Sequence, residues 1–213
     1  MSPEANRSFR LLPAAWIETT LALAERVSRS LARLGISPNA LSVLGLLAGI
    51  ASGAFYALDR PALAAALIII CGIFDILDGK VAAVSGQRSL FGAVVDSSLD
   101  RYSEFFVFLG VAYHLRHGWG VWLTFFAFLG ASMVSYTRAR AEGLGVDCQV
   151  GPMQRAERLL LLVIGTAAGV VFRVLDPALL VAVAVIAAVS HLTAVQRIFH
   201  VRRVEQARTS KEI

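Results

Sequence analysis

Long hydrophobic runs separated by short polar stretches dominate this chain of 213 residues. A membrane-spanning helix needs about 20 mostly apolar residues, and six segments qualify once the two shorter ones are extended into neighbouring polar residues. No long segment alternates apolar and polar residues with the period of two that is typical of strands. The pattern predicts an all-α integral membrane protein with six transmembrane helices. The expected spans are roughly Asn39–Leu58, Ala62–Val84, Phe91–His114, Val121–Tyr136, Arg158–Phe172 and Pro177–Phe199.

The segment between Ala14 and Leu34 has a different pattern, because hydrophobic residues recur at helical spacing while charged residues occupy the opposite face. This pattern is typical of an N-terminal amphipathic helix that lies on the membrane surface. Gly35 is a predicted stop for this helix, and Ser37 and Pro38 are a predicted cap and first turn for the following span. We expect one membrane domain over residues 1–213, with the surface helix at 14–34, a six-helix bundle at 37–200 and a polar tail at 201–213.

The amino-acid composition also indicates a membrane protein. Hydrophobic residues form 57% of the chain and charged residues only 16%, whereas about a quarter of a soluble domain is charged. The net charge of +5 comes from basic residues beside the hydrophobic runs, which favours anionic lipid headgroups and phosphorylated substrates over nucleic acid as partners. Cys71 lies in a hydrophobic run and Cys148 in a polar loop, so we expect no disulfide.

The distribution of basic residues between alternate connections predicts the orientation. Only Arg60, Arg116 and Arg173 fall on one side of the predicted topology, and the other lysines and arginines fall on the side that carries both termini. Cytoplasmic connections are enriched in lysine and arginine. We therefore expect a multi-pass protein of the inner (plasma) membrane, with both termini facing the cytoplasm.

Four aspartates at the ends of two neighbouring hydrophobic runs carry the strongest functional signal. Asp75 and Asp78 are three residues apart in one predicted helix, and Asp96 and Asp100 are four residues apart in the next. Each pair therefore lies on one helix face, and the short connection between the helices brings both faces together near the cytoplasmic end. A charged residue at membrane depth costs about 2.5–3.5 kcal/mol on insertion scales, which favours a functional role.

Clustered carboxylates repel one another unless cations lie between them, and Mg²⁺ or Mn²⁺ prefers such oxygen ligands. Two of these ions suit phosphoryl transfer, because together they neutralise phosphate oxygens and orient the attacking and leaving groups. Two other interpretations stay open. In the first, the aspartates form ordinary ion pairs with Arg88, Arg101 or a neighbouring lysine. In the second, they bind ions in a transporter, but their distance from the bilayer midplane favours an enzyme over a transporter.

The segment from Phe74 to Arg101 resembles the signature of the CDP-alcohol phosphotransferases, also described as class-I CDP-alcohol phosphatidyltransferases. The signature reads D-x2-D-G-x2-A-R-x8-G-x3-D-x3-D, and this chain departs from it only at Ala83, where the family has arginine. The six predicted spans and the surface helix are also similar to that family. The matching residues are Asp75, Asp78, Gly79, Ala82, Gly92, Asp96 and Asp100.

The resemblance implies a metal-dependent enzyme of phospholipid biosynthesis that uses CDP-diacylglycerol and releases CMP. It implies two bound ions, Mg²⁺ or Mn²⁺, and Asp100 as the general base. The expected metal ligands are Asp75, Asp78, Asp96 and Asp100. The residues expected to contact the CDP moiety are Asn39, Asp78, Gly79, Ala82, Arg88 and Gly92.

The departure at Ala83 removes one expected contact to the nucleotide, which Arg88 or Lys80 would have to replace. It also leaves open the interpretation that this chain is an inactive member of the family, a scaffold protein that keeps the pocket without catalysing the reaction. The resemblance further implies a homodimer. Small residues that suit a helix interface are Gly110, Gly130 and Ala131.

Basic residues at three predicted helix ends indicate a phosphate-bearing acceptor. Arginine presents a planar set of donors that suits phosphate, although the positive-inside rule alone also accounts for such residues. The segments SYTRARAEG, QRAERL and VQR resemble those of phosphatidylinositol-phosphate synthases, which implies inositol 1-phosphate as the acceptor. Glycerol 3-phosphate as acceptor and CDP-inositol as donor are the alternatives within the same chemistry. The arginines expected to bind the acceptor phosphate are Arg138, Arg155 and Arg197, with Arg140 and Arg158 as further candidates.

Overall fold

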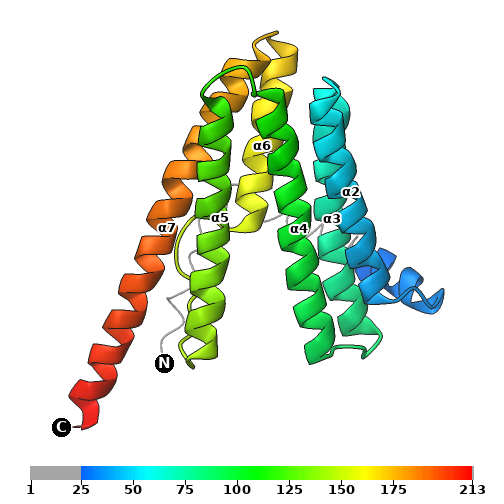
Figure 1. The fold of residues 1–213 in the computed structure, drawn as a ribbon. Coiled ribbons are helices and arrows are strands. Elements are labelled where there is room, and N and C mark those ends of the chain that lie inside the picture. The colour runs from blue at the N-terminus through cyan, green and yellow to red at the C-terminus, as the bar shows by residue number, and fades with distance from the viewer. Residues whose placement is uncertain (1–24, 213) are drawn as a thin grey trace. The chain divides into compact units, whose positions relative to one another are not determined.

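The computed structural model describes residues 25–212, and all regular secondary structure in that range is helical (Figure 1). The all-α prediction is therefore confirmed for the described part of the chain. A helix at 25–33 is the described end of the predicted surface helix; residues 14–24 lie outside the described range, and the amphipathic helix as a whole stays a prediction. The longer helices are α2 (Pro38–Ala57), α3 (Pro61–Val84), α4 (Leu90–His114), α5 (Gly120–Gly143), α6 (Arg155–Val171) and α7 (Leu175–Glu212).

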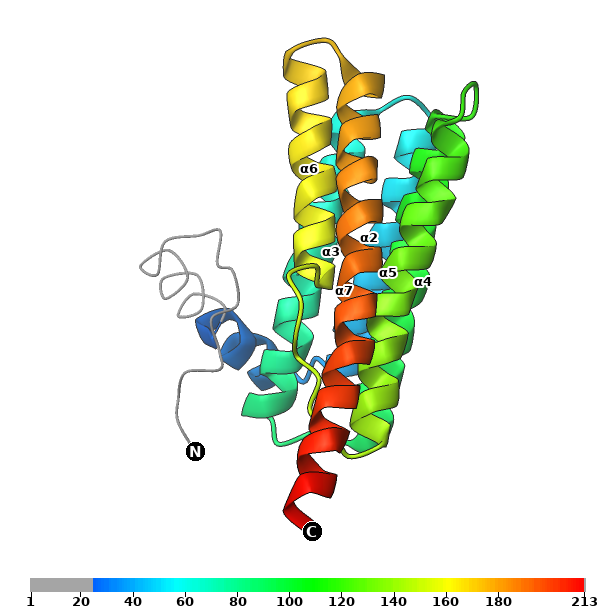
Figure 2. The same ribbon diagram turned by 90° about the vertical axis from the view of Figure 1, so that its left-hand side faces the viewer.

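The helices form two compact units, and the chain passes from the first to the second between His114 and Leu115. In the first unit α2 packs against both α3 and α4, and in the second unit α7 packs against both α5 and α6 (Figure 2). Each unit is thus a small bundle in which one helix contacts the other two. The expectation of one functional domain over residues 1–213 stays a prediction.

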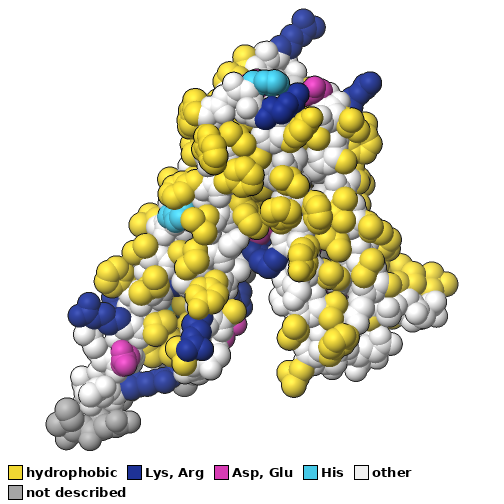
Figure 3. Space-filling view, in the orientation of Figure 1, with side chains coloured by type: hydrophobic (Ala, Val, Ile, Leu, Met, Phe, Trp, Pro, Cys, Tyr) yellow, Lys and Arg dark blue, Asp and Glu magenta, His cyan; other side chains and the backbone are white. Residues whose placement is uncertain are grey.

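Four helices have the length and hydropathy of membrane spans, namely α2, α3, α5 and α7. Hydrophobic side chains cover most of the visible surface of each unit (Figure 3). Among them, Trp122 is 74% exposed and Val181 is 65% exposed, which is typical of a surface in contact with lipid. Helix α4 contains several charged residues and α6 has only 17 residues, so the predicted spans over these two helices stay predictions.

The start of α2 has the features that the sequence predicted. Ser37 is the N-cap, and its Oγ accepts a hydrogen bond from the backbone N–H of Ala40 at 3.3 Å. Pro38 occupies the first turn, where its missing N–H leaves no helical hydrogen bond unmade. Gly35, the predicted stop of the preceding helix, has a φ of +74°, which glycine adopts without strain.

Helices α2 and α4 approach each other closely because glycines lie at their contact. A Cβ atom added to Gly53 of α2 would collide with the backbone oxygen of Phe106. A Cβ atom added to Gly110 of α4 would collide with the backbone of Gly53. Small residues allow helices in membranes to gain van der Waals contact that larger residues would prevent.

The small residues that we expected at a dimer interface pack within one chain instead. Gly110 contacts α2, and Gly130 of α5 faces Ser190 and His191 of α7. Ala131 is fully buried. Sequence alone did not distinguish contacts within the chain from contacts between chains, and the predicted homodimer requires a different surface.

Helix α7 continues through Glu212, so the predicted polar tail is helical to that residue. No glycine or proline interrupts residues 199–212. Val201 and Val204 pack against a small hydrophobic cluster that includes Ala141 and Cys148. This packing connects the end of α7 to the loop after α5, and it extends the helix beyond the membrane-spanning hydrophobic run.

The Cys148 thiol is part of this cluster rather than a reactive surface group. Its side chain is completely buried. Burial raises the pKa of the Cys148 thiol, and the nearby Arg197 opposes this effect without cancelling it. The thiol is therefore protonated at neutral pH and acts as a small hydrophobic side chain.

We expect the Gly53→Ala substitution to destabilise the first unit, because the added methyl group must push α2 and α4 apart. Overpacking of this kind costs about 1–3 kcal/mol, which would lower the midpoint of thermal unfolding of the purified protein in detergent. Gly72→Ala is the matched control, since Gly72 also lies in a membrane-spanning helix and a Cβ atom there meets no other atom within 4 Å. Equal midpoints for the two variants would contradict a special role for the α2–α4 contact.

Candidate active site

Three of the four predicted aspartates lie close together in the first unit. Asp75 is part of α3, and Asp96 and Asp100 occupy successive turns of α4. One carboxylate oxygen of each lies within 4.8 Å of the others, and all three residues are half-buried. The prediction that the acidic faces of the two helices meet is therefore confirmed.

The donor set of this carboxylate group fits a divalent cation with a preference for oxygen. Oxygen ligands of one octahedral Mg²⁺ lie about 3–4 Å apart, given metal–oxygen distances of about 2.1 Å. The three carboxylate oxygens lie within 4.8 Å of one another, which is close to this spacing. All three donors are carboxylates, so the group suits Mg²⁺ or Mn²⁺ better than metals that prefer sulfur or nitrogen.

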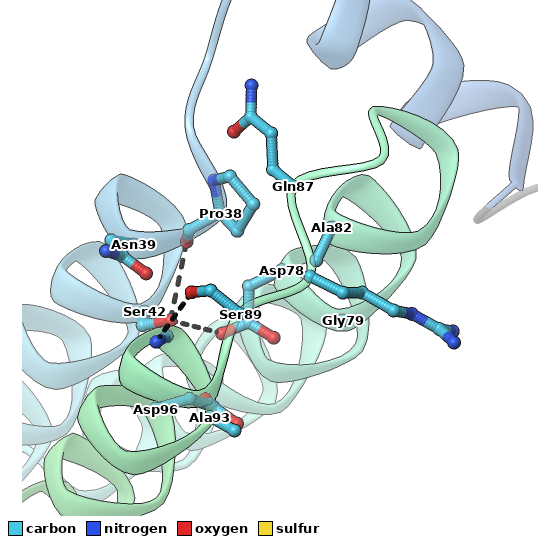
Figure 4. A pocket seen from close by; sticks show the side chains of 12 residues that line it. Pro38, Asn39, Ser42, Asp78, Gly79, Ala82, Gln87, Ser89, Ala93 and Asp96 are labelled. Carbon is cyan, nitrogen blue, oxygen red and sulfur yellow. Dashed lines mark hydrogen bonds between the residues drawn. The ribbon is translucent and has the colours of Figure 1, made fainter.

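Asp78 lies beside this group and is held by α2. Only 4% of Asp78 is exposed, and its Oδ2 accepts a hydrogen bond from the Ser42 hydroxyl at 2.7 Å (Figure 4). The Ser42 hydroxyl thus supplies a donor to a carboxylate that would otherwise lose the hydration it has in water. Asp78, the fourth predicted metal ligand, is therefore held by a hydrogen bond from α2 and is not part of the group formed by the other three carboxylates.

The arginine that follows Asp100 has a different carboxylate partner. Arg101 donates a hydrogen bond from Nη1 to Oε2 of Glu104 at 2.7 Å, and the Glu104 side chain is fully buried. Glu104 lies one turn after Asp100 in α4. Arg101 thus has a carboxylate partner outside the group of aspartates.

A cavity of about 340 Å³ opens beside the carboxylate group in the first unit (Figure 4). Its wall is formed by the first turns of α2 and α4, the last turns of α3 and the loop between α3 and α4. Asp96 belongs both to this wall and to the carboxylate group. Every residue that we expected to contact the CDP moiety lines the cavity. These residues are Asn39, Asp78, Gly79, Ala82, Arg88 and Gly92.

The lining of the cavity indicates which residue can replace the arginine that the family has at the position of Ala83. Of the two candidates, Arg88 and Lys80, Arg88 lines the cavity. Lys80 is not among the described residues that line it. A guanidinium group is therefore available at the cavity from the loop rather than from α3.

Glycine keeps the cavity open at two points. A Cβ atom added to Gly79 would meet no other atom within 4 Å, so a larger side chain there would extend into open space. A Cβ atom added to Gly92 would lie 3.0 Å from Ser89 Oγ and 3.5 Å from Asn39 Oδ1. A side chain at either position would compete with a ligand for the same volume.

Sequence reasoning missed three polar residues of the cavity wall, namely Ser42, Gln87 and Ser89. Ser42 lies one turn after Asn39 in α2, and this spacing was a usable signal. Ser89 Oγ accepts a hydrogen bond from the backbone N–H of Gly92 at 2.9 Å, as a cap residue before a helix does. Nothing in the local pattern distinguishes Gln87 from an ordinary loop residue.

The second unit contains the five arginines that we expected to bind the acceptor phosphate, and two of them are buried. Arg197 of α7 donates from Nε to the Val150 carbonyl at 2.9 Å and from Nη1 to the Val134 carbonyl. Arg158 of α6 is fully buried and donates to the Met153 carbonyl at 3.5 Å. Both guanidinium groups thus hold the loop between α5 and α6 in place.

The other three arginines are more accessible. Arg138 is half-buried and pairs with Glu142 at 2.8 Å. Arg155 is half-buried at the start of α6, and Arg140 is exposed near the end of α5. Arg138 and Arg197 both act on the Cys148 thiol through their charge, so these two arginines lie in the same part of the second unit.

Known proteins resemble this chain in sequence and in structure. A family model described as CDP-alcohol phosphatidyltransferase matches residues 35–196. An archaetidylinositol phosphate synthase of Pyrococcus horikoshii is 35% identical over 143 residues, which cover 67% of this chain and 75% of that protein.

Two crystal structures of the phosphatidylinositol phosphate synthase of Mycobacterium tuberculosis are also similar. The structure with CDP-DAG bound has 31% identity and a TM-score of 0.77, and the match covers 84% of this chain and 94% of that chain. The structure in complex with manganese and citrate has 30% identity and a TM-score of 0.76, with coverage of 84% and 88%.

We expect Asp96→Asn to weaken binding of Mn²⁺ to the purified protein by at least about tenfold, because loss of even an outer-shell partner costs about 10–100-fold in metal affinity. Binding is measured by the electron paramagnetic resonance signal of free Mn²⁺ during titration. Asp59→Asn is the control, since Asp59 is an exposed residue of the α2–α3 connection. Unchanged affinity in Asp96→Asn would show that the carboxylate group is not a metal site.

Proposed function

Because this chain belongs to the CDP-alcohol phosphatidyltransferase family, we propose that it transfers a phosphatidyl group from CDP-diacylglycerol to inositol 1-phosphate and releases CMP. The observation that carries this proposal is the position of Asp96, which joins a group of three carboxylates to a cavity lined by all six expected nucleotide contacts. A cation site next to a nucleotide-sized cavity is the arrangement that transfer from a nucleoside diphosphate requires. The names of the similar proteins support an inositol phosphate as acceptor.

The cavity is the proposed site for the CDP moiety. Arg88 is the cationic residue of its wall, and a guanidinium group forms strong, charge-assisted hydrogen bonds with phosphate. Asn39 in the first turn of α2 and Ser89 directly before α4 add polar groups to the wall. Gly79 and Gly92 leave the room that the ligand needs.

Asp75, Asp96 and Asp100 are the proposed metal ligands, with Asp78 as a fourth that its bond to Ser42 holds nearby. Two Mg²⁺ or Mn²⁺ ions at these residues would neutralise phosphate charge in the donor. The manganese in a similar structure supports this assignment. The described residues contribute only oxygen donors here, which agrees with either ion.

Asp100 is the proposed general base. The acceptor hydroxyl oxygen forms a bond to the phosphorus of the lipid phosphate, and the bond from this phosphorus to the oxygen of the CMP leaving group breaks. The hydroxyl proton passes to the Asp100 carboxylate, and CMP departs with the bridging oxygen. A carboxylate is a weak base, so the correct placement of the hydroxyl supplies much of the rate.

The acceptor phosphate is proposed to bind arginines of the second unit, chiefly Arg138, Arg155 and Arg197. Arg155 and Arg138 are half-buried, which leaves them partly accessible. Arg197 and Arg158 are both buried and bonded to backbone carbonyls, so both guanidinium groups are already oriented. Of the two, Arg197 is the first candidate because the resemblance of the segment VQR to the synthases implies phosphate binding by its arginine, and Arg158 and the exposed Arg140 are further candidates.

The protein is proposed to lie in the inner membrane with both termini and the active site on the cytoplasmic side, and to form a homodimer. The basic residues of the α5–α6 connection and of the end of α7 support this orientation. CDP-inositol as donor and glycerol 3-phosphate as acceptor are the alternatives to test against the proposal.

We expect purified protein with CDP-diacylglycerol and Mg²⁺ to release CMP when inositol 1-phosphate is added, and to do so much more slowly with glycerol 3-phosphate. We expect Arg155→Gln to raise the KM for inositol 1-phosphate by about tenfold, since a hydrogen bond to a charged group contributes about 1.5–3 kcal/mol. CMP is quantified by chromatography over a range of acceptor concentrations.

Arg202→Gln is the control for this measurement, because Arg202 is an exposed arginine of α7 in the same unit. Its KM should match that of the unchanged protein. CMP release with glycerol 3-phosphate alone would refute the proposed acceptor, and equal KM values for both variants would refute the role of Arg155.

We expect Arg88→Gln to raise the KM for CDP-diacylglycerol by about tenfold, because the cavity then lacks its guanidinium group. Adding Ala83→Arg to this variant should restore part of the affinity, since it returns an arginine to the position that the family signature specifies. The same CMP assay, with the donor concentration varied, measures both effects. A larger effect of Lys80→Gln than of Arg88→Gln would show that the lysine supplies the contact instead.

A further inference from the structure

A second hollow lies far from the proposed catalytic residues in sequence, on the C-terminal half of α7. Its volume is about 470 Å³, and six of its lining residues belong to one face of that helix. None of them is among the residues proposed for the donor, the metal or the acceptor. They are Leu192, Val195, Gln196, Phe199, His200 and Arg203.

The lining changes from apolar to basic along the helix. Leu192, Val195 and Phe199 are respectively 55%, 47% and 51% exposed, so they form a hydrophobic strip on the surface. Arg203 lies one turn beyond Phe199 and is also exposed. The distance along the helix from Leu192 to Arg203 is about 16 Å at 1.5 Å per residue, which approaches the length of an extended acyl chain.

The loop between α5 and α6 forms a fixed wall on one side of the hollow. Val150 lines the hollow, and its carbonyl accepts the hydrogen bond from Arg197 Nε at 2.9 Å. A second contact lies three residues earlier in the same loop, where the Asp147 carbonyl is 3.0 Å from His200 Nε2. Two hydrogen bonds to α7 thus hold this loop against the helix.

The hollow lies at the end of the span that the sequence predicts. Helix α7 is apolar over most of its first half, polar residues begin to interrupt it from Ser190 onward, and Arg202 and Arg203 lie just beyond the predicted end of the span at Phe199. Arginines at that depth lie at the level of lipid headgroups. A single phospholipid can therefore lie along the hollow with its acyl chain toward Leu192 and its headgroup toward Arg203.

We propose that this hollow binds an anionic glycerophospholipid of the surrounding bilayer, with an acyl chain along Leu192, Val195 and Phe199 and the phosphate at Arg203. The charge of the site favours an anion, since Arg203 is the charged residue of the lining. Glu205 is two residues further along and points about 200° away around the helix. A second protein chain at this site would instead have to cover Arg203 and supply a partner for its charge.

The test compares two adjacent arginines that differ in whether they line the hollow. Unchanged protein, Arg203→Gln and Arg202→Gln are equilibrated with equal amounts of phosphatidylglycerol and phosphatidylcholine, and the retained lipid is measured by native mass spectrometry. We expect the unchanged protein and Arg202→Gln to retain phosphatidylglycerol preferentially. In Arg203→Gln we expect the ratio of retained phosphatidylglycerol to phosphatidylcholine to fall by about fivefold, in line with the contribution of one basic residue near the membrane surface.

Phe199→Ala provides the second readout, because it should reduce retention of both lipids while preserving the preference for phosphatidylglycerol. Equal losses of preference in Arg203→Gln and Arg202→Gln would overturn the proposal, since they would indicate a general attraction between the basic helix end and acidic lipid. Displacement of the lipid by soluble glycerol phosphate would also overturn it, because the acyl chain would then add nothing. A shift of Phe199→Ala from dimer to monomer would indicate that a second copy covers the hollow instead.

Discussion

The mutual repulsion of carboxylates is the constraint around which the first unit is organised. Asp75, Asp96 and Asp100 each place an oxygen within 4.8 Å of the others, in a chain whose neighbouring helices have the hydropathy of membrane spans. In such surroundings a charge is less well screened than in water, so the repulsion is strong. A fold can hold three carboxylates in this way only if other contacts keep their helices together, and a bound cation then converts the repulsion into affinity.

Helix α2 supplies those contacts without contributing a carboxylate. It packs against both α3 and α4, and the glycine contact between Gly53 and Gly110 brings α4 close to it. At its other end, α2 provides Ser42, whose hydroxyl binds Asp78 of α3. The same helix thus determines the spacing of the two acidic helices and forms part of the cavity beside them.

The sequence predicted the features that depend on local spacing. The cap at Ser37, the stop at Gly35 and the meeting of Asp75 with Asp96 all follow from periodicity and from a short connection. Features that depend on contacts between distant residues were not predictable. The helical end of α7 depends on a cluster with residues after α5, and Gly110 and Gly130 fit an interface between chains as well as they fit the contacts within the chain that the structure contains.

Asp96 is shared between the carboxylate group and the cavity, and this sharing makes the two sites thermodynamically dependent on each other. A cation beside Asp96 reduces the negative charge that a diphosphate would meet in the cavity, and a diphosphate in the cavity adds oxygen atoms near the cation. By linkage, each ligand would raise the affinity for the other by the same factor. On the proposed function, the protein would therefore hold a nucleotide weakly until a cation is present, and the departure of one ligand would favour the release of the other.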